Sequence, residues 1–426
     1  MKGKDRLLHL LESRSLHQLL ASLYGSQSST EFHVNRIFRL IHNHPIPGND
    51  ETALFSTPGR TELAGNHTDH QGGKVIAAAV NLDMLAVATK ITEPVISIQS
   101  EGFAPVTVNL NHLNIQERER GTTDAMVRGI AKGFADRGFP IGGFIANTHS
   151  LVAPGSGLSS SAAFEVLIAT IMNSFYHHNR ADAETLAEIA QDAEQQYYRK
   201  PSGLMDQLAC AAGGIGLFDF SHHVQRTEID FNFANSGYDM VIVHTGTDHS
   251  SHAKQYAAIP REMRAVAACF DCKNLSEVPF SLFSETIHSI RYTVQNDRAL
   301  LRAFHFFMEN NRVSAMYQAL EAHDMRSYLA LVRESGISSA QYVQNLSVPE
   351  EPAEQSIPLA LALTELFLEE DGACRVHGGG FAGTIQAYIP HTRINEYTNT
   401  MNSIFGEGAT TVLSVRKLPS MRIDTI

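Results

Sequence analysis

The hydrophobic and polar positions along the chain follow helical and strand periods in both halves. Near the amino terminus, leucines separated by Arg6, His9, Glu12 and Arg14 predict an amphipathic helix and not a signal peptide. Apolar and β-branched runs predict strands at 52–57, 75–89, 94–99, 105–110, 143–152, 214–220 and 238–244, the first of them ending at Pro58. Helical spacing predicts helices at 123–137, 162–175, 183–198, 251–270, 297–309, 313–320 and 324–334.

The remaining segments complete an α+β pattern. A polar stretch at 221–237 and a less regular segment after 270 separate these elements. A helix ending at 368, a strand–loop–strand unit at 375–388, a helix at 394–405 and a strand at 410–415 close the chain. The length of 426 residues is enough for two domains. We place the boundary near residue 230, which gives domains at 1–230 and 231–426.

Composition excludes several classes of protein. The chain is 43% hydrophobic and 18% charged, as is usual for globular proteins, and its net charge of −12 argues against broad nucleic-acid binding. No apolar run is long enough to span a membrane, and four scattered cysteines are typical of a reducing compartment. We therefore expect a cytoplasmic protein that acts on a small molecule, without a membrane, nucleic-acid or protein partner.

The first motif, residues 58–73, reads Pro-Gly-Arg-Thr-Glu-Leu-Ala-Gly-Asn-His-Thr-Asp-His-Gln-Gly-Gly. Its dense hydrogen-bonding side chains suit a polyhydroxylated ligand, whose hydroxyls each need a donor or an acceptor. Two alternatives stay open at this point. His67, Asp69 and His70 are compatible with a metal site, and the whole segment is compatible with a solvated turn.

The second motif, residues 154–163, reads Pro-Gly-Ser-Gly-Leu-Ser-Ser-Ser-Ala-Ala and lies between a predicted strand and a predicted helix. Glycines let the backbone approach an anion, and the hydroxyls stand where a helix offers unpaired N–H groups. This pattern predicts a phosphate-binding loop, although it is not a Walker A sequence. A serine-rich helix cap after a surface loop is the alternative.

Two further segments carry possible chemistry. Asp206, in Gly203-Leu204-Met205-Asp206-Gln207, has apolar neighbours and is a candidate base or a helix cap. The third motif, Gly378-Gly379-Gly380-Phe381-Ala382-Gly383, formally matches the dinucleotide fingerprint. A strand is predicted after it where that fingerprint requires a helix, so we reject NAD binding and expect a close backbone approach there.

In their order along the chain, the three motifs resemble those of the GHMP small-molecule kinases, and the segment around Asp206 is similar too. The first motif resembles the galactokinase signature, Gly-Arg-x-Asn-x-Ile-Gly-Glu-His-Thr-Asp-Tyr. The resemblance covers residues 57–418. It implies a two-domain α+β fold that binds nucleotide and sugar in the cleft between the domains. It also implies transfer of the γ-phosphoryl group of ATP, with Mg²⁺, to the anomeric hydroxyl of galactose or a close relative.

The resemblance also implies roles for individual residues. By position, Asp206 is the catalytic base and Arg60 orients the acceptor hydroxyl. The implied sugar contacts are Asn66, His67, Asp69 and Tyr256. The implied ATP and phosphate contacts are Pro154, Gly155, Ser156, Gly157, Leu158, Ser159, Ser160, Ser161, Gly379 and Gly380, with Ser161 also toward magnesium.

Two departures from the signature bear on the substrate. Asn66 stands where galactokinases have Glu, which we expect to weaken or redirect sugar binding by roughly tenfold and to leave the chemistry intact. His70 stands where they have Tyr. These departures leave open a kinase for a related sugar, such as N-acetylgalactosamine or a uronic acid. A non-catalytic sensor of galactose and ATP is the other alternative.

Overall fold

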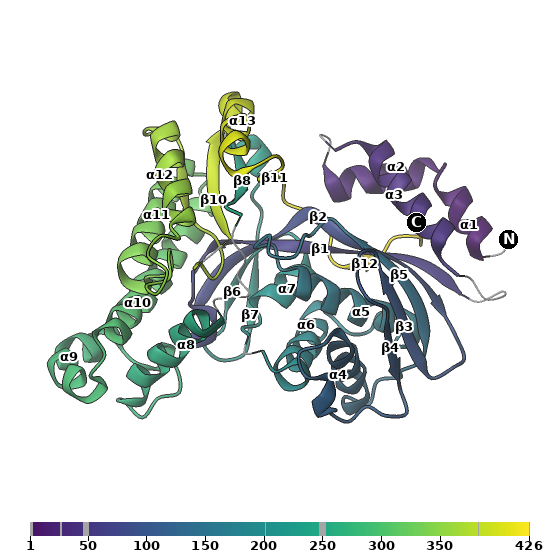
Figure 1. The fold of residues 1–426 in the computed structure, drawn as a ribbon, viewed down its shortest axis with the longest axis horizontal. Coiled ribbons are helices and arrows are strands. Elements are labelled where there is room, and N and C mark those ends of the chain that lie inside the picture. The colour runs from purple at the N-terminus through teal and green to yellow at the C-terminus, as the bar shows by residue number, and fades with distance from the viewer. Residues whose placement is uncertain are drawn as a thin grey trace.

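The computed structural model describes residues 3–25, 28–45, 51–200, 202–246, 253–381 and 383–425. Its helices are α1 (Gly3–Leu10), α2 (Arg14–Tyr24), α3 (Thr30–Asn43), α4 (Thr123–Asp136), α5 (Ser160–Tyr176), α6 (Ala183–Asp192), α7 (Met205–Ala212), α8 (Ala253–Ala268), α9 (Phe280–Val294), α10 (Asp297–Glu321), α11 (Met325–Ser338), α12 (Ser356–Leu368) and α13 (Ile394–Phe405). Its strands are β1 (Thr52–Ala64), β2 (Lys74–Lys90), β3 (Val95–Ser100), β4 (Val106–Asn109), β5 (Phe144–Ser150), β6 (Ile215–Asp219), β7 (Gln225–Ile229), β8 (Tyr238–His244), β9 (Ala373–Val376), β10 (Thr384–Pro390), β11 (Thr410–Leu413) and β12 (Met421–Arg422). Figure 1 shows α1 to α3 at one end of the molecule and α8 to α12 at the other.

The first sheet has the strand order β12–β1–β2–β5–β3–β4, and β6 and β7 extend it from β2. Its strands are antiparallel except for the parallel pair β3 and β5. Side chains alternate along a strand, so β1 and β2 contribute to two cores. Phe55 and Ala86 pack with α4 to α6, whereas Leu54 and Leu85 pack with α1 to α3. Helices therefore cover both faces of this part of the sheet (Figure 1).

The second sheet is antiparallel, with the order β11–β8–β10–β9. The same alternation divides β8 between two cores. Met240 and Ile242 pack with α10 and α11, and Val241 and Val243 pack with α12 and α13. The predicted α+β class, with strands and helices in both halves, is confirmed.

Two strand predictions were wrong. The first strand does not end at Pro58 but continues to Ala64, so Arg60 and Glu62 are strand residues. The register of β1 against β2 shifts between Pro58 and Arg60, and proline is tolerated at such a bulge because its missing N–H is not needed in the ladder. The polar stretch at 221–237 contains β7, an edge strand whose largely exposed residues carry no hydrophobic signal.

Two helix predictions were also wrong. The segments 297–309 and 313–320 form the single helix α10, and the segment after 270 contains α9. Asn310 and Asn311, which lie between the two predicted helices, are weak helix formers. Tertiary contacts override that preference, since the Asn310 side chain accepts a hydrogen bond from the Lys74 backbone N–H at 2.7 Å. Residues 251 and 252 of the predicted helix at 251–270 lie outside the described residues.

The chain changes sheets between Ile229, the last residue of β7, and Tyr238, the first of β8. It later returns, because β12 pairs with β1. The boundary near residue 230 stays a prediction.

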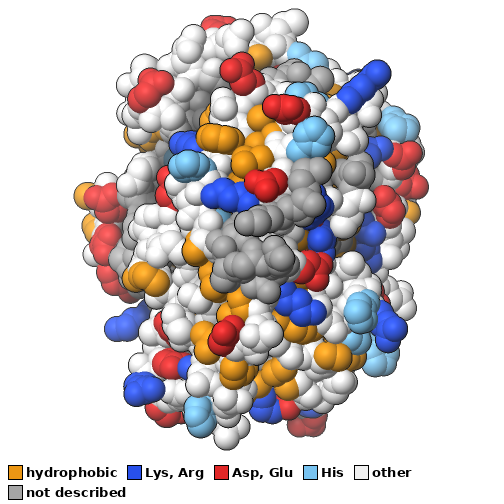
Figure 2. Space-filling model, turned by 90° about the vertical axis from the view of Figure 1, so that its right-hand side faces the viewer, with side chains coloured by type: hydrophobic (Ala, Val, Ile, Leu, Met, Phe, Trp, Pro, Cys, Tyr) orange, Lys and Arg blue, Asp and Glu red, His pale blue; other side chains and the backbone are white. Residues whose placement is uncertain are grey.

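The surface at the right-hand end of Figure 1 is shown face-on in Figure 2. Acidic and basic side chains are interspersed on it, and hydrophobic ones form small groups. The net charge of −12 is therefore not gathered into a single acidic patch on this face. In the described ranges, no helix combines the length and hydrophobicity that a membrane span requires.

Candidate functional site

A cavity of about 70 Å³, here called the inner cavity, gathers residues of the first and third motifs and of the segment around Asp206. The predicted site residues that line it are Arg60, Asn66, His67, Asp69, Asp206, Tyr256 and Gly379. They come from β1 and the loop after it, the first turn of α7, helix α8 and the loop between β9 and β10. Residues up to 319 positions apart therefore face one space.

Asp206 and Arg60 form the centre of this site. The Arg60 Nε–H donates to Asp206 Oδ1 at 2.7 Å, and Arg60 Nη1 donates to the Gly157 carbonyl at 2.5 Å. The Ser159 hydroxyl donates to the other carboxylate oxygen, Oδ2. Burial on its own raises the pKa of Asp206, but the charge of Arg60 and these hydrogen bonds outweigh it and hold the pKa below its usual value. Asp206 is therefore a carboxylate at neutral pH, in contact with the second motif.

The second motif is a tight loop that leads into α5. Gly157 has φ +70°, and a Cβ on it would lie 2.6 Å from Thr384 Oγ1, so this close approach requires glycine. Ser159 is left-handed, with φ 59°, and α5 begins at the next residue. The Leu158 side chain is buried in the core beside the second sheet, and its carbonyl accepts a hydrogen bond from the Arg60 backbone N–H at 3.1 Å. The exposed residues Pro154 and Gly155 form the tip of the loop.

A second space, of about 310 Å³, lies at the start of α5 and is here called the loop cavity. Pro154, Ser160 and Ser161 line it, together with Glu194 and Lys200. The first N–H groups of a helix have no partner within the helix and attract anions. The loop cavity therefore has the donors and the hydroxyls that a polyphosphate group needs.

A polar network leads from the loop cavity to Gln207, the residue after Asp206. The Lys200 ammonium group donates to Glu194 Oε1 at 2.6 Å, and the Gln207 amide donates to Glu194 Oε2 at 2.9 Å and to Glu165 Oε2 at 3.0 Å. Burial, and then the charge of Glu194, raise the pKa of Glu165 well above its usual value. Glu194 lies in a π-helical turn, Ala193–Tyr198, which follows α6. A π-turn of this kind is frequently found at functional sites.

Asn66 lines the inner cavity, but both polar atoms of its side chain form hydrogen bonds within the protein. Its amide nitrogen donates to the Gly378 carbonyl at 2.6 Å and to Glu62 at 3.4 Å. Its amide oxygen accepts from Ser339 and Asn345, each at 3.2 Å. An amide has two donor hydrogens and two acceptor sites, so this side chain is fully satisfied by the protein. Asn66 therefore shapes the cavity and joins the first motif to the third.

Glu62 provides a carboxylate in the place where Asn66 has none. It lines the inner cavity and pairs with the buried Arg375 at 3.0 Å. The galactokinase signature has Asn at the position of Glu62 and Glu at that of Asn66, so these residue types are exchanged here. The two side chains touch, and the exchange keeps one carboxylate in the same cavity.

His67 and Tyr256 form one wall of the inner cavity, with ring centroids 5.5 Å apart. Burial lowers the pKa of His67 to about 4, so the ring is neutral. A carbonyl oxygen only accepts, so the 3.0 Å contact with Gly379 places the proton on His67 Nε2. The other nitrogen, Nδ1, is then an acceptor. A Cβ on Gly379 would collide with the Tyr256 ring, which explains the glycine there.

The third motif lies against the first. Gly379 is on the inner cavity, and a Cβ on Gly380 would collide with the Asn345 carbonyl. A strand follows this motif, as predicted, so the motif lacks the helix of a dinucleotide fold. The contacts of Gly379 and Gly380 with ATP stay predictions.

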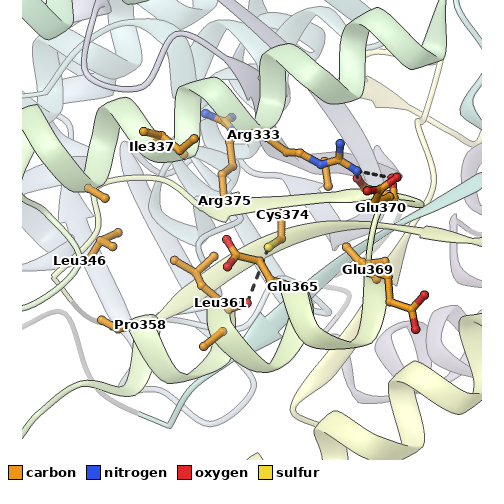
Figure 3. Close-up of a pocket in the computed structure, with 16 residues that line it drawn as sticks. Arg333, Ile337, Leu346, Pro358, Leu361, Glu365, Glu369, Glu370, Cys374 and Arg375 are labelled. Carbon is orange, nitrogen blue, oxygen red and sulfur yellow. Dashed lines mark hydrogen bonds between the residues drawn. The ribbon is translucent and has the colours of Figure 1, made fainter.

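A larger cavity, of about 540 Å³, lies between α11, α12 and β9 and shares no lining residue with the inner cavity or the loop cavity (Figure 3). Arg333 donates to the Glu370 carbonyl at 2.6 Å, and Cys374 contacts the Leu361 carbonyl at 3.9 Å. The residues that the sequence predicts for the site lie elsewhere. One residue that lines this larger cavity, Arg375, forms an ion pair with Glu62, which lines the inner cavity.

Several residues that line the site carry no motif in the sequence. Glu194 lies in the π-helical turn, and Lys200 and Ser202 belong to the loop that follows it. Glu62 lies inside the first motif, where only the contact with Arg375 distinguishes it. The described part of the chain holds no cluster of three or more His, Cys, Asp and Glu residues arranged as metal ligands. This applies to His67, Asp69 and His70, whose metal interpretation gains no support.

Two family models match the chain. Residues 125–214 match the GHMP kinases N terminal domain, and residues 45–90 match the galactokinase galactose-binding signature. The galactokinase of Clostridium tetani is 25% identical over 368 residues, which cover 85% of this chain and 91% of the relative. The galactokinase of Streptomyces coelicolor is 27% identical over 360 residues, which cover 84% and 90%.

Solved structures share the fold. The Lactococcus lactis galactokinase, complexed with galactose, superposes with a TM-score of 0.74 at 20% identity and covers 87% of this chain and 95% of its own. The mevalonate kinase of Methanococcus jannaschii superposes with a TM-score of 0.61 at 16% identity, and the match covers 87% of this chain and 99% of its own. The predicted two-domain α+β kinase fold is therefore confirmed. Residues 125–214 therefore match a GHMP kinase N-terminal domain, residues 45–90 match the galactokinase galactose-binding signature, and the chain is similar over most of its length to curated galactokinases.

Proposed function

We propose that the protein transfers the γ-phosphoryl group of ATP to the anomeric hydroxyl of galactose, giving galactose 1-phosphate and ADP. The observation that carries the proposal is the position of Asp206, which is bonded to both Arg60 and Ser159. Through these contacts the inner cavity, suited to a sugar, meets the loop that is suited to phosphate. The curated relatives named galactokinase support the same reaction.

The proton and phosphoryl movements follow from this geometry. The O–H bond of the anomeric hydroxyl breaks, and its proton passes to the Asp206 carboxylate. The sugar oxygen forms a bond to the γ-phosphorus, and the bond from that phosphorus to the ADP oxygen breaks. Phosphoryl transfer depends mainly on positioning and on charge stabilisation, which suits a base held firmly by Arg60. Arg60 also holds the Gly157 carbonyl, so it fixes the carboxylate relative to the loop.

Magnesium fits the residues of the loop cavity. Mg²⁺ prefers oxygen ligands and is commonly held by one or two protein oxygens together with the phosphates of a nucleotide. The Ser161 hydroxyl and the Glu194 carboxylate both line the loop cavity and would hold it. When bound, the ion would neutralise charge on the phosphates. The sugar and the nucleotide are the partners that this reaction needs. We propose that the reaction takes place in the cytoplasm.

Lys200 is a further residue for this reaction. It is the single described residue that lines both the inner cavity and the loop cavity. Burial acts to lower the pKa of its ammonium group, but the charge of Glu194 and the hydrogen bond with it raise the pKa above its usual value. A permanent positive charge at this border stabilises a phosphoryl group that moves from one cavity to the other.

Lys200→Met is expected to lower kcat by roughly tenfold to 100-fold, because one charge that stabilises the transferred group is lost. Initial rates with saturating ATP and galactose measure this. Lys417→Met is the matched control, since Lys417 is 72% exposed and touches neither cavity. Equal rates for both variants would remove Lys200 from the mechanism.

Asp69 makes sugar binding depend on pH. Burial, and then the charge of Asp206, raise the pKa of Asp69 to about 7. Above that pH the ionised carboxylate accepts stronger hydrogen bonds from sugar hydroxyls than the neutral acid does. The affinity for galactose, measured by calorimetry without nucleotide, is expected to rise as the pH passes through 7. The Asp69→Asn variant should bind galactose more weakly, and its affinity should not change as the pH passes through 7. If the affinity of the variant still rises there, another group is responsible for the pH dependence.

The reaction itself is tested by ATP consumption and product identification with a panel of hexoses and magnesium. Galactose-dependent turnover that yields the 1-phosphate supports the proposal. Binding of sugar and ATP without any phosphorylated product would contradict it and favour a sensor.

A further inference from the structure

A cavity of about 390 Å³ adjoins the inner cavity and is here called the arginine cavity. Ser202, Gly203 and Tyr256 line both spaces and form their border. The inner cavity, at about 70 Å³, is well below the roughly 300–1,000 Å³ common for ligand pockets. Because the two spaces adjoin, a substrate held at Asp206 can extend a substituent into the larger arginine cavity.

The lining of this cavity is strongly basic. Arg120, Arg199 and Arg264 line it, and no acidic side chain does. Within the described ranges, Arg120 and Arg264 form no ion pair, and Arg199 reaches Glu117 at 3.5 Å through two largely exposed side chains. Three positive charges around one space repel each other, and an anion between them relieves this. In a chain with a net charge of −12, such a cluster needs an explanation.

Two neutral donors point to the same kind of ligand. His70 Nε2 and Ser202 Oγ are buried polar atoms without a hydrogen-bond partner, and both residues line the arginine cavity. His70 Nδ1 contacts the Gln71 amide nitrogen at 3.3 Å, which makes Nδ1 the acceptor and leaves the proton on Nε2. Unpartnered buried groups are rare in proteins and call for a ligand or water. A hydroxyl, an imidazole N–H and guanidinium groups form a set of donors for an anion.

Two carboxylates of the inner cavity are already paired with other arginines, Glu62 with Arg375 at 3.0 Å and Asp206 with Arg60 at 2.7 Å. The third, Asp69, is partly protonated at neutral pH because burial raises its pKa to about 7. An anionic ligand would therefore supply the main negative charge opposite the arginine cavity. Guanidinium groups present pairs of N–H donors that match the oxygens of carboxylate, sulfate and phosphate groups.

We propose that the preferred substrate is a sugar of galactose configuration that bears an anionic group, and that Arg120, Arg199 and Arg264 bind this group in the arginine cavity. The inference rests on the proposed sugar-kinase function and narrows its substrate to acidic sugars. His70 and Ser202 complete the site by donating to the same group. The anomeric hydroxyl stays at Asp206 and is phosphorylated as described above.

The test compares kcat/KM, with ATP and magnesium, for galactose, galacturonic acid, galactose 6-sulfate, galactose 6-phosphate and N-acetylgalactosamine. We expect at least one acidic sugar to exceed galactose by tenfold or more, and the best of them identifies the carboxylate, sulfate or phosphate as the group that is bound. N-acetylgalactosamine controls for bulk without charge. Preference for it over every acidic sugar would overturn the inference.

The arginines are tested by Arg264→Gln and Arg120→Gln, two exposed positions where folding is not at risk. Each variant is expected to raise KM for the best acidic sugar, and so to lower kcat/KM for it by about tenfold or more. The kcat/KM for galactose should change by less than twofold. Arg261→Gln, on the same helix and away from the cavity, is the matched control. Turnover of galactose in preference to every acidic sugar overturns the inference and leaves the sugar kinase intact, whereas absence of turnover with all sugars overturns both.

Discussion

Asp206→Asn is expected to lower kcat by about 10²- to 10⁴-fold while the protein stays folded. The amide has nearly the shape of the carboxylate and its oxygen can still accept from Ser159 or Arg60, but it cannot take up the proton of the sugar hydroxyl. Asp206 lies in the first turn of α7 with its side chain 34% exposed, so no core packing is lost. Initial rates together with a circular dichroism melt measure both parts of the expectation.

The matched control is Asp230→Asn. Asp230 is 95% exposed, lies between the two sheets in sequence and touches only Lys417 through its side chain among the described residues. Its variant should retain full activity. A rate for Asp206→Asn above about a tenth of the wild-type rate would show that another group accepts the proton, because loss of a general base normally costs at least about 100-fold.

Asp83→Asn is expected to lower the free energy of unfolding by about 3–5 kcal/mol. Asp83 is fully buried on β2 and is bonded to Arg36 of α3 at 3.1 Å and to the Tyr24 hydroxyl of α2 at 2.7 Å. It also lies 3.8 Å from Arg416, near the carboxyl terminus. Without its charge, two buried guanidinium groups lose their counterion in a medium where charges are poorly solvated. Urea denaturation measures the loss, and Asp230→Asn should leave the midpoint unchanged.

The pH dependence of this effect has a definite sign. Burial acts to raise the pKa of Asp83, but Arg36, Arg416 and the hydroxyls that donate to it hold the pKa below its usual value. The contribution of Asp83 is therefore present at pH values above about 4, the ordinary carboxyl pKa, and is lost as the pH falls through the lower folded value. The difference in stability between wild type and Asp83→Asn should shrink in acid. A difference that stays constant down to pH 2 would contradict the ionic explanation.

Local patterns predicted the elements that bury most of their apolar residues. Burial on both faces gives β2 a continuous apolar run, and burial of one face gives α4 its helical spacing. The edge strand β7 and the continuous α10 leave no such period. The β7 residues are mostly exposed, and Asn310 in α10 is held by a contact with Lys74 that lies 236 positions away.

The three motifs were visible in sequence for a different reason. Glycines at 65, 157 and 379 stand where a Cβ would collide with another segment, and such positions accept little else. Hydroxyl, imidazole and carboxylate groups between these glycines mark a ligand site. The order of the motifs resembles that of the GHMP kinases, and this resemblance indicated sugar-kinase chemistry.

What the tertiary structure alone decided is which of these groups meet and which charges are balanced. The sequence by itself determined the α+β class and the loop before α5. It also determined the resemblance of the segment around Asp206 to a kinase family. It could not show that Glu62 replaces the carboxylate missing at Asn66, that Lys200 stands between two cavities, or that three arginines face one space. Most of these groups are distant along the chain, and a local pattern carries no record of partners that only the packing of sheets and helices brings together.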